Sequence, residues 1–198
     1  MDHYFTNNNN LKSNLNIIKY DAFDTSFSIY TDNGVFSKKK IDYGTELLLK
    51  CYLSEHSEKL KVLDVGCGYG IISVVIGKIT DSYVDAVDVN KRSVHLAKMN
   101  IEKNKVNGKA FISDAYENIN DNYDIIITNP PIRAGNEVVY KILLDSRKHL
   151  NQNGELWFVI RKDQGAQTIA RNMSEYFEVE LIKRDKGYNI YRAKNVDK

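Results

Sequence analysis

The sequence Asn129-Pro130-Pro131 places hydrogen-bond acceptors at the end of a predicted strand. The preceding run, 123–128, is short, apolar and rich in isoleucine, which is typical of a strand buried in a parallel sheet. A residue before proline is held extended, and proline has no backbone N–H. The corner therefore presents the Asn129 amide oxygen and the Pro130 carbonyl, a pair that favours a donor such as an exocyclic amine.

A glycine-rich segment, 66–70, lies between a predicted strand at 61–65 and a predicted helix at 71–79. Strand, glycine turn and helix in this order begin a nucleotide-binding unit. The spacing does not fit a dinucleotide, because Ile71 stands where the last glycine of G-x-G-x-x-G belongs. Asp64, just before the glycines, suits an ammonium better than a pyrophosphate. S-adenosylmethionine has an ammonium, a sulfonium and no phosphate, so we predict this cofactor, with contacts from Asp64, Gly66, Gly68 and Gly70.

Two further predicted strands, 83–89 and 109–113, lead into acidic residues. Asp88 lies twenty positions beyond Gly68, where such folds use a carboxylate to accept from ribose hydroxyls. Asp114 is predicted to accept from the adenine amino group, and Asn129 completes the cofactor set. Asp88 alone would also fit a helix N-cap, and NAD sites also use a carboxylate to bind ribose. The choice of cofactor therefore depends on the glycine-rich segment, Asp88 and Asn129 taken together.

The elements that position these residues alternate between strand and helix, which predicts an α/β fold with a parallel sheet. After a helix at 44–54 the predicted order continues with strand 61–65, helix 71–79, strand 83–89, helix 91–104, strand 109–113, strand 123–128, helix 137–149, strand 155–160, helix 165–176, strand 178–183 and strand 188–193. The residues at 71–79 have strand propensity, but parallel neighbours need a crossover there, which favours a helix.

The amino-terminal part is predicted to differ from this pattern. Residues 1–14 are rich in Asn and are expected to be disordered or extended. Strands at 16–20 and 27–31 follow, with Asp32-Asn33-Gly34 as a hairpin turn into Val35. The predicted organisation is one domain over 15–198, made of a β extension at 15–45 and a cofactor-binding core at 46–198.

Together these motifs resemble the class I S-adenosylmethionine-dependent methyltransferases, and most closely the small-domain RsmC/YbxB-like family. The matching pieces are Gly34-Val35-Phe36-Ser37, Leu63 to Gly70, Asp88-Val89-Asn90, Thr128 to Gly135, Gly154 to Trp157, and Lys186-Gly187-Tyr188. The resemblance implies a Rossmann-like, doubly wound sheet of seven strands with the last one antiparallel. It also implies methylation of guanine N2 in small-subunit ribosomal RNA.

In this reading Asn129 and Pro130 are the catalytic residues, since they hold the amine while the methyl group is transferred. Pro131, Ile132, Arg133 and Phe36 are predicted to bind the substrate. The resemblance implies an aromatic residue at position 132, and Ile132 forgoes its stacking on the base, worth about 1–3 kcal/mol. Phe36 is our candidate for a substitute. Adenine N6, a protein glutamine amide, and a non-catalytic RNA-associated role remain alternatives.

The composition limits the other function classes. The net charge of +2 does not itself indicate nucleic-acid binding, but Lys38-Lys39-Lys40 and Arg133 could meet RNA phosphates near the amine. The two cysteines and the lack of an apolar stretch near about 20 residues favour a cytoplasmic protein without membrane segments. The four histidines show no ligand spacing, so we predict no metal site. A monomer is favoured, with ribosomal RNA or the small subunit as partner.

Overall fold

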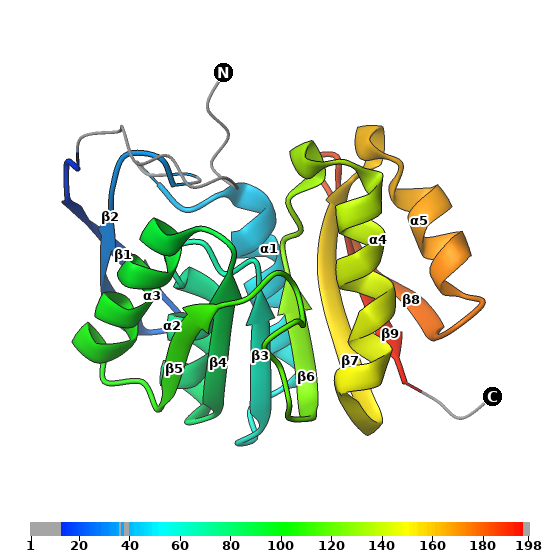
Figure 1. Ribbon diagram of the computed structural model, residues 1–198, viewed down its shortest axis with the longest axis horizontal. Helices are drawn as coiled ribbons and strands as arrows, with labels where there is room; N and C mark the ends of the chain where they lie inside the picture. Colours follow the sequence, from blue (N-terminus) through cyan, green and yellow to red (C-terminus); the bar gives the residue numbers. More distant parts are fainter. Residues whose placement is uncertain (1–12, 36, 38–39, 196–198) are drawn as a thin grey trace.

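A seven-stranded sheet forms the centre of the molecule (Figure 1). The structure, a computed structural model, describes residues 13–35, 37 and 40–195. Across the sheet the strands are β5 (Gly108–Ile112), β4 (Tyr83–Asp88), β3 (Lys61–Val65), β6 (Tyr123–Thr128), β7 (Leu150–Arg161), β9 (Tyr188–Lys194) and β8 (Glu178–Asp185). The first five are parallel, whereas β9 is antiparallel to both β7 and β8. The predicted sheet with a reversed last strand is confirmed.

Helices cover both faces of this sheet. The apolar side chains of α1 (Tyr43–Glu55), α2 (Ile71–Thr80) and α3 (Lys91–Lys103) share one core cluster. Those of α4 (Asn136–Asp145) and α5 (Ala166–Met173) share the other cluster, and these two helices lie in front of the sheet in Figure 1. Because both faces are covered, the central strands are apolar without alternation.

Most predicted elements are present, with shifted ends. The helix over 71–79 forms despite its β-branched residues, as the parallel crossover requires. The helix predicted over 137–149 ends at Asp145 and continues as the 3₁₀ turn η2 (Ser146–His149), and the one predicted to reach 176 ends at Met173. Two more 3₁₀ turns, η1 (Ile132–Ala134) and η3 (Lys162–Gln164), follow strands β6 and β7.

The amino-terminal hairpin differs from the prediction. It joins β1 (Asn16–Ala22) to β2 (Thr25–Thr31) through Phe23 and Asp24, which have φ values of 55° and 54°. A two-residue loop with both φ values positive matches the twist of paired strands. A turn does form at Asn33 and Gly34, but its predicted continuation into a strand was wrong, because Val35 lies outside any strand. The Asp32 carboxylate before this turn accepts from Ser13 Oγ at 2.8 Å.

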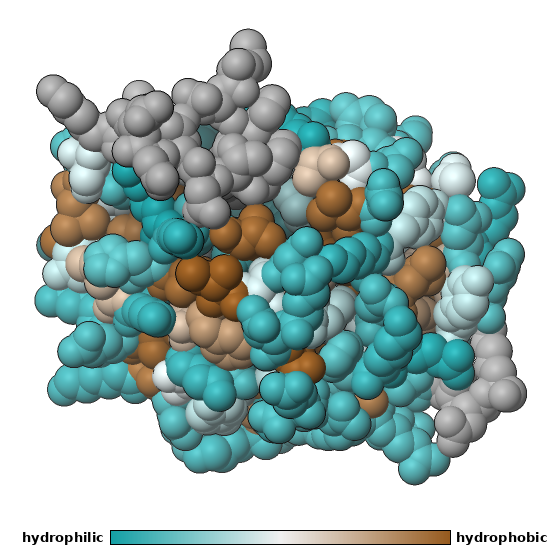
Figure 2. All heavy atoms as spheres, viewed as in Figure 1, coloured by the Kyte–Doolittle hydropathy of each residue, from teal (hydrophilic) through white to brown (hydrophobic). Residues whose placement is uncertain are grey.

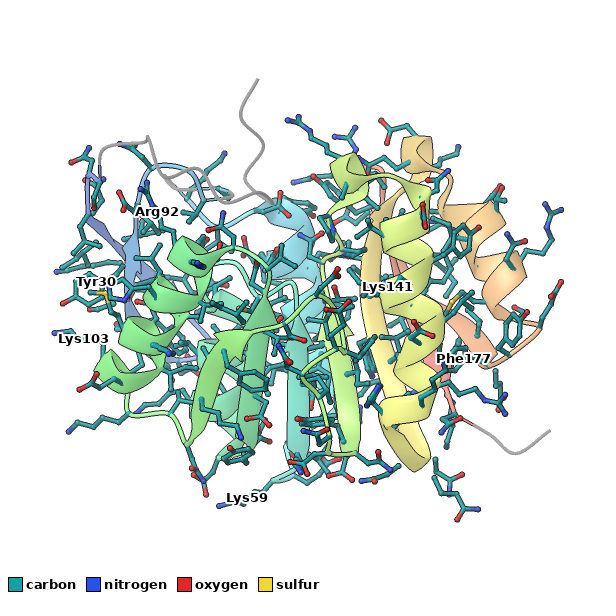
Figure 3. All side chains as sticks on the ribbon, viewed as in Figure 1. Tyr30, Lys59, Arg92, Lys103, Lys141 and Phe177 are labelled. Atoms are coloured by element: carbon teal, nitrogen blue, oxygen red, sulfur yellow. The ribbon has the colours of Figure 1, made fainter. Side chains whose placement is uncertain are left out.

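Asn100 of α3 and Asn104, the C-cap of this helix, fasten the hairpin to the core. Asn100 accepts from the Tyr30 N–H at 2.7 Å and donates to the Tyr30 carbonyl at 2.9 Å, and Asn104 contacts the Ser28 backbone in the same way. Asn100 also donates to the Tyr69 carbonyl in the glycine-rich segment at 2.7 Å. Figure 3 shows Tyr30 beside α3. The amides replace a neighbouring strand at the open edge of β2 and connect it to the glycine-rich turn.

The predictions for residues 1–12 lie outside the described residues, and the division of the chain at residues 45 and 46 stays a prediction. Within the described part, no helix combines the length and apolarity needed to span a bilayer.

Candidate active site

Two cavities lie next to each other at the carboxyl ends of the parallel strands. The first has a volume of about 280 Å³, and its walls include residues at or just after the ends of β3, β4, β5 and β6. The second has a volume of about 330 Å³ and lies toward the ends of β7 and β9. Asp42, Asn129 and Pro130 line both cavities and so form the wall between them.

The glycine-rich turn forms one wall of the first cavity. The N–H groups of Gly66 and Cys67 both donate to the Val87 carbonyl, at 2.8 and 2.9 Å, which pins the turn to β4. Gly66 and Gly68 line the cavity with φ values of 71° and 54°, a conformation that favours glycine. A side chain at Gly68 would meet no protein atom within 4 Å, so the missing Cβ leaves open space for a ligand.

Asp88, the predicted ribose acceptor, is the last residue of β4. It lines the first cavity, its Oδ2 accepts from the Gly68 N–H at 2.9 Å, and its Oδ1 accepts from the Asn90 N–H at 2.8 Å. Burial raises the pKa of Asp88 to about 6, against the lowering effect of these backbone hydrogen bonds. A carboxylate oxygen can accept more than one hydrogen bond, so Asp88 can also accept from hydroxyl donors of a ligand.

Asp64 does not face the cavity, contrary to the prediction. Its side chain is fully buried behind the turn, where Oδ2 accepts from Ser73 Oγ at 2.6 Å and from the Ser73 N–H at 3.1 Å. Oδ1 has no hydrogen-bond partner among the described residues, and burial raises the pKa of Asp64 to about 7. Successive side chains of a strand point to opposite faces of the sheet. The Asp64 side chain points to the face covered by α2, not into the cavity at the strand end. Asp64 therefore holds the beginning of α2 against β3 and is not among the residues that line the cavity.

Gly70 also does not line the first cavity. It is the N-cap of α2 with φ of 84°, and an added Cβ would lie 3.0 Å from the Ala97 Cβ and 3.1 Å from the Ala97 Cα. Its predicted contact with the cofactor is replaced by a packing role, because it lets α2 approach α3 closely.

We expect Gly70→Ala to destabilise the protein more than Gly165→Ala. Gly165 has nearly the same backbone conformation, with φ of 81°, but nothing lies within 4 Å of its added Cβ. The left-handed conformation alone should cost about 1 kcal/mol of unfolding free energy at either site. The contact with Ala97 should add roughly 1–3 kcal/mol at Gly70. Urea unfolding of both variants measures the difference, and equal losses would contradict the packing role.

Asp114 lines the first cavity at its far end, as predicted. Its carboxylate is exposed and forms an ion pair with Lys141 Nζ at 3.1 Å; Figure 3 shows Lys141 on α4. The neighbouring wall is apolar and consists of Ala115, Val138 and Ile142. Figure 2 shows apolar surface between α3 and α4 on this side of the molecule. An apolar slot beside a carboxylate suits an aromatic ring with an exocyclic amine.

The Asn129 side chain is held by its nitrogen. Nδ2 donates to Thr45 Oγ1 at 2.8 Å and to Asp42 Oδ2 at 3.2 Å, and both residues belong to the beginning of α1. Asp42 is the N-cap of this helix and also accepts from the Thr45 N–H at 3.0 Å. Within the described residues no donor reaches Asn129 Oδ1, which leaves this oxygen as an oriented acceptor on the wall shared by the two cavities.

The two prolines differ in the cavities that they line, since Pro130 lines both and Pro131 lines one. The Pro130 carbonyl accepts from the Ile132 N–H at 2.9 Å across Pro131, whose φ of −75° and ψ of 78° define an inverse γ-turn. A carbonyl has two lone pairs, so one remains for a further donor. Pro131 lines only the first cavity, which corrects its predicted place at the substrate, because the γ-turn directs the chain back over Gly66.

Ile132 and Arg133, the predicted substrate contacts, line the second cavity. Ile132 is half-buried and also packs against the core cluster, whereas Arg133 is exposed at the rim. Phe36, our candidate aromatic, lies outside the described residues, as do Lys38 and Lys39.

Sequence reasoning missed two groups of residues in the site. Asp42 and Thr45 orient Asn129, and their signal was available, since an aspartate just before an apolar helix is a typical N-cap. Arg161 and Tyr188 line the second cavity from β7 and β9. They are adjacent only because β9 inserts beside β7, and no local pattern in the sequence reveals that pairing.

A family model described as "Methyltransferase small domain" matches residues 26–192. The chain belongs to this family. The predicted enzyme class, S-adenosylmethionine-dependent methyltransferase, and the predicted class I fold are confirmed. Relatives include the "Uncharacterized protein YbxB" of Bacillus subtilis (strain 168), 39% identical over 98% of this chain and 99% of that protein. This likeness confirms the RsmC/YbxB-like membership inferred from the motifs.

Another relative is ribosomal RNA small subunit methyltransferase C of Haemophilus influenzae (strain 86-028NP). It is 32% identical over 85% of this chain and 51% of its own length. This chain therefore spans about half the length of that relative. Among solved structures, T. thermophilus 16S rRNA N2 G1207 methyltransferase RsmC, in complex with AdoMet and guanosine, has a TM-score of 0.84 at 22% identity. That match covers 91% of this chain and 50% of that chain, and at this identity it shows the fold.

Proposed function

We propose that the protein transfers a methyl group from S-adenosylmethionine to an exocyclic base amine of RNA, with guanine N2 of small-subunit ribosomal RNA as the target. The observation that supports this most is the orientation of Asn129. Its nitrogen is engaged by Asp42 and Thr45, so its oxygen is left as an acceptor between the two cavities. One cavity would hold the methyl donor and the other the amine.

The first cavity fits the cofactor. Asp88 offers acceptors for two ribose hydroxyls, and the turn at Gly66 and Gly68 lets a ligand approach the backbone. The apolar wall and Asp114 suit adenine. The cofactor's ammonium was expected near Asp64; we now assign this role to Asp42, because Asp42 is the carboxylate on the wall near Asn129.

Catalysis would depend on positioning. The cofactor supplies a methyl group already activated by its sulfonium. An aromatic amine is a poor nucleophile because its lone pair is delocalised. Asn129 Oδ1 and the Pro130 carbonyl would accept from its two hydrogens and turn the nitrogen lone pair toward the first cavity. Alignment of this kind contributes up to about 7–11 kcal/mol to a reaction barrier, so the proton can leave to water without a strong base.

The RNA substrate is inferred from relatives and from the second cavity. Several relatives at 30% identity or more are ribosomal RNA small subunit methyltransferases. The second cavity has arginines at its rim, Arg133 and Arg161, which suit a polyanionic substrate. A ribosomal protein L11 methylase shares the fold with a TM-score of 0.70 at 20% identity, so the fold alone does not select the acceptor. A glutamine or adenine acceptor is therefore tested as an alternative outcome.

A methyl-transfer assay tests the proposal. Tritiated S-adenosylmethionine is supplied with small ribosomal subunits, naked small-subunit RNA, ribosomal protein and DNA in parallel. We expect label in RNA, and nucleoside mass analysis should identify N2-methylguanosine. Label in protein or DNA, N6-methyladenosine as the product, or no transfer to any of the four substrates would contradict the proposed function.

A further inference from the structure

The second cavity contains an aromatic residue that the motif itself lacks. The position after the two prolines is Ile132, which offers no ring for a base. Tyr188, at the beginning of β9, lines the same cavity. Asn129, Arg161 and Tyr188 come from the ends of three neighbouring strands, β6, β7 and β9, so the reactive corner and this ring face one space.

Helix α1 holds the Tyr188 ring in place. A Cβ at Gly44 would lie 2.7 and 2.8 Å from two ring carbons of Tyr188, so the ring packs where a side chain of α1 would otherwise stand. The Tyr43 ring lies beside it, with centroids 5.7 Å apart. The same helix begins at Asp42, which holds Asn129. The ring and the amide oxygen are therefore placed by one rigid element.

A cation lies over the ring. The Arg161 guanidinium is 5.6 Å from the Tyr188 ring centroid, and Asp163 holds it through two hydrogen bonds of 3.0 and 2.9 Å. Aromatic rings and guanidinium planes are the two surfaces on which proteins stack unpaired RNA bases. Because the Arg161 side chain is exposed, it can move aside and allow a base to reach the ring.

We propose that Tyr188 is the residue on which the target base stacks, and that it takes the place of the aromatic absent at position 132. This inference rests on the proposed RNA function. Tyr188 acts as a substrate-positioning residue: its ring fixes the plane of the base, and Asn129 and Pro130 then meet the amine at the base edge.

Kinetics of Tyr188 variants on the RNA that the wild type methylates test the inference. We expect Tyr188→Ala to lower kcat/KM for RNA by about 10- to 100-fold, as loss of one stacking contact predicts, with the affinity for S-adenosylhomocysteine within twofold. Tyr188→Phe should keep kcat/KM within about threefold, because it keeps the ring. The exposed Tyr176, which lines neither cavity, provides a matched control, and Tyr176→Ala should behave as wild type.

A rescue variant separates stacking from a structural role. Adding Ile132→Phe to Tyr188→Ala should recover at least about threefold of the lost kcat/KM, because it restores an aromatic surface in the same cavity. An unchanged kcat/KM for Tyr188→Ala, or an equal loss in Tyr188→Phe, would overturn the inference. So would a failed rescue, or a Tyr188→Ala chain that does not fold. If the wild type methylates no RNA, the proposed function fails as well; if it does and Tyr188→Ala matches it, only this inference fails.

Discussion

Asn129→Ala should reduce kcat for RNA methylation by about 10²- to 10³-fold, the usual loss when one preorganised catalytic hydrogen-bonding group is removed. The cofactor affinity should stay within a few fold of wild type, because Asp88 and the glycine-rich turn are unaffected. Single-turnover methyl transfer gives the rate, and calorimetry with S-adenosylhomocysteine gives the affinity. Equal losses in both would mean that Asn129 is structural.

A pair of variants at Thr45 tests the orientation of the amide. Thr45→Val removes the hydroxyl that accepts from Asn129 Nδ2 at 2.8 Å, whereas Thr45→Ser keeps it. We expect the valine variant to lose about tenfold in kcat, which corresponds to one hydrogen bond of ordinary strength. The serine variant should remain near wild type. Equal rates in the two variants would show that this hydrogen bond does not set the direction of Oδ1.

Asp88→Ala should show the reverse pattern, with a large loss of cofactor affinity. Two hydrogen bonds from ribose hydroxyls to a carboxylate contribute about 3 kcal/mol or more, so Kd should rise at least about 100-fold. The rate at saturating cofactor should change much less. An affinity unchanged from wild type would exclude the ribose role.

A deoxyribose analogue separates the ribose contact from the effect on the turn. Asp88 also accepts from the Gly68 N–H, so its removal can loosen the turn as well. Wild type should bind S-adenosylhomocysteine lacking a ribose hydroxyl roughly tenfold less tightly than the parent compound. In Asp88→Ala that difference should vanish, because no acceptor remains. A difference that persists in the variant would assign the ribose to another residue.

The cofactor affinity should also depend on pH through Asp88. Burial raises the pKa of this carboxyl to about 6, and only the ionised form accepts from both hydroxyls. The affinity should therefore be full above about pH 7 and fall as the pH drops through 6, approaching about tenfold per pH unit. Asp88→Asn should bind weakly and without this dependence. A pH profile of Asp88→Asn that parallels wild type would assign the titration to another group.

The sequence by itself determined the strands, their order along the chain and the residue types at their ends. Continuous apolar runs predict strands buried on both faces, and glycine or proline at their ends predicts where the backbone turns. For this reason Gly66, Gly68, Asp88 and Asn129 lie on the cavity walls where the motifs placed them. These signals are local, since each depends on residues that adjoin in the chain.

Only the tertiary structure decided which way side chains point and which distant residues meet. Asp64 and Asp88 both belong to strand ends, but one is buried against Ser73 and the other lines a cavity. Gly70 is adjacent to the turn in sequence, yet its place is set by Ala97 on α3.

The same holds for the partners of the reactive residues. Asp42 reaches Asn129 across 87 positions of the chain, and Tyr188 reaches the same cavity through the insertion of β9 beside β7. The physical reason is that these contacts depend on packing between elements, whereas the sequence pattern reports mainly the preferences within each element.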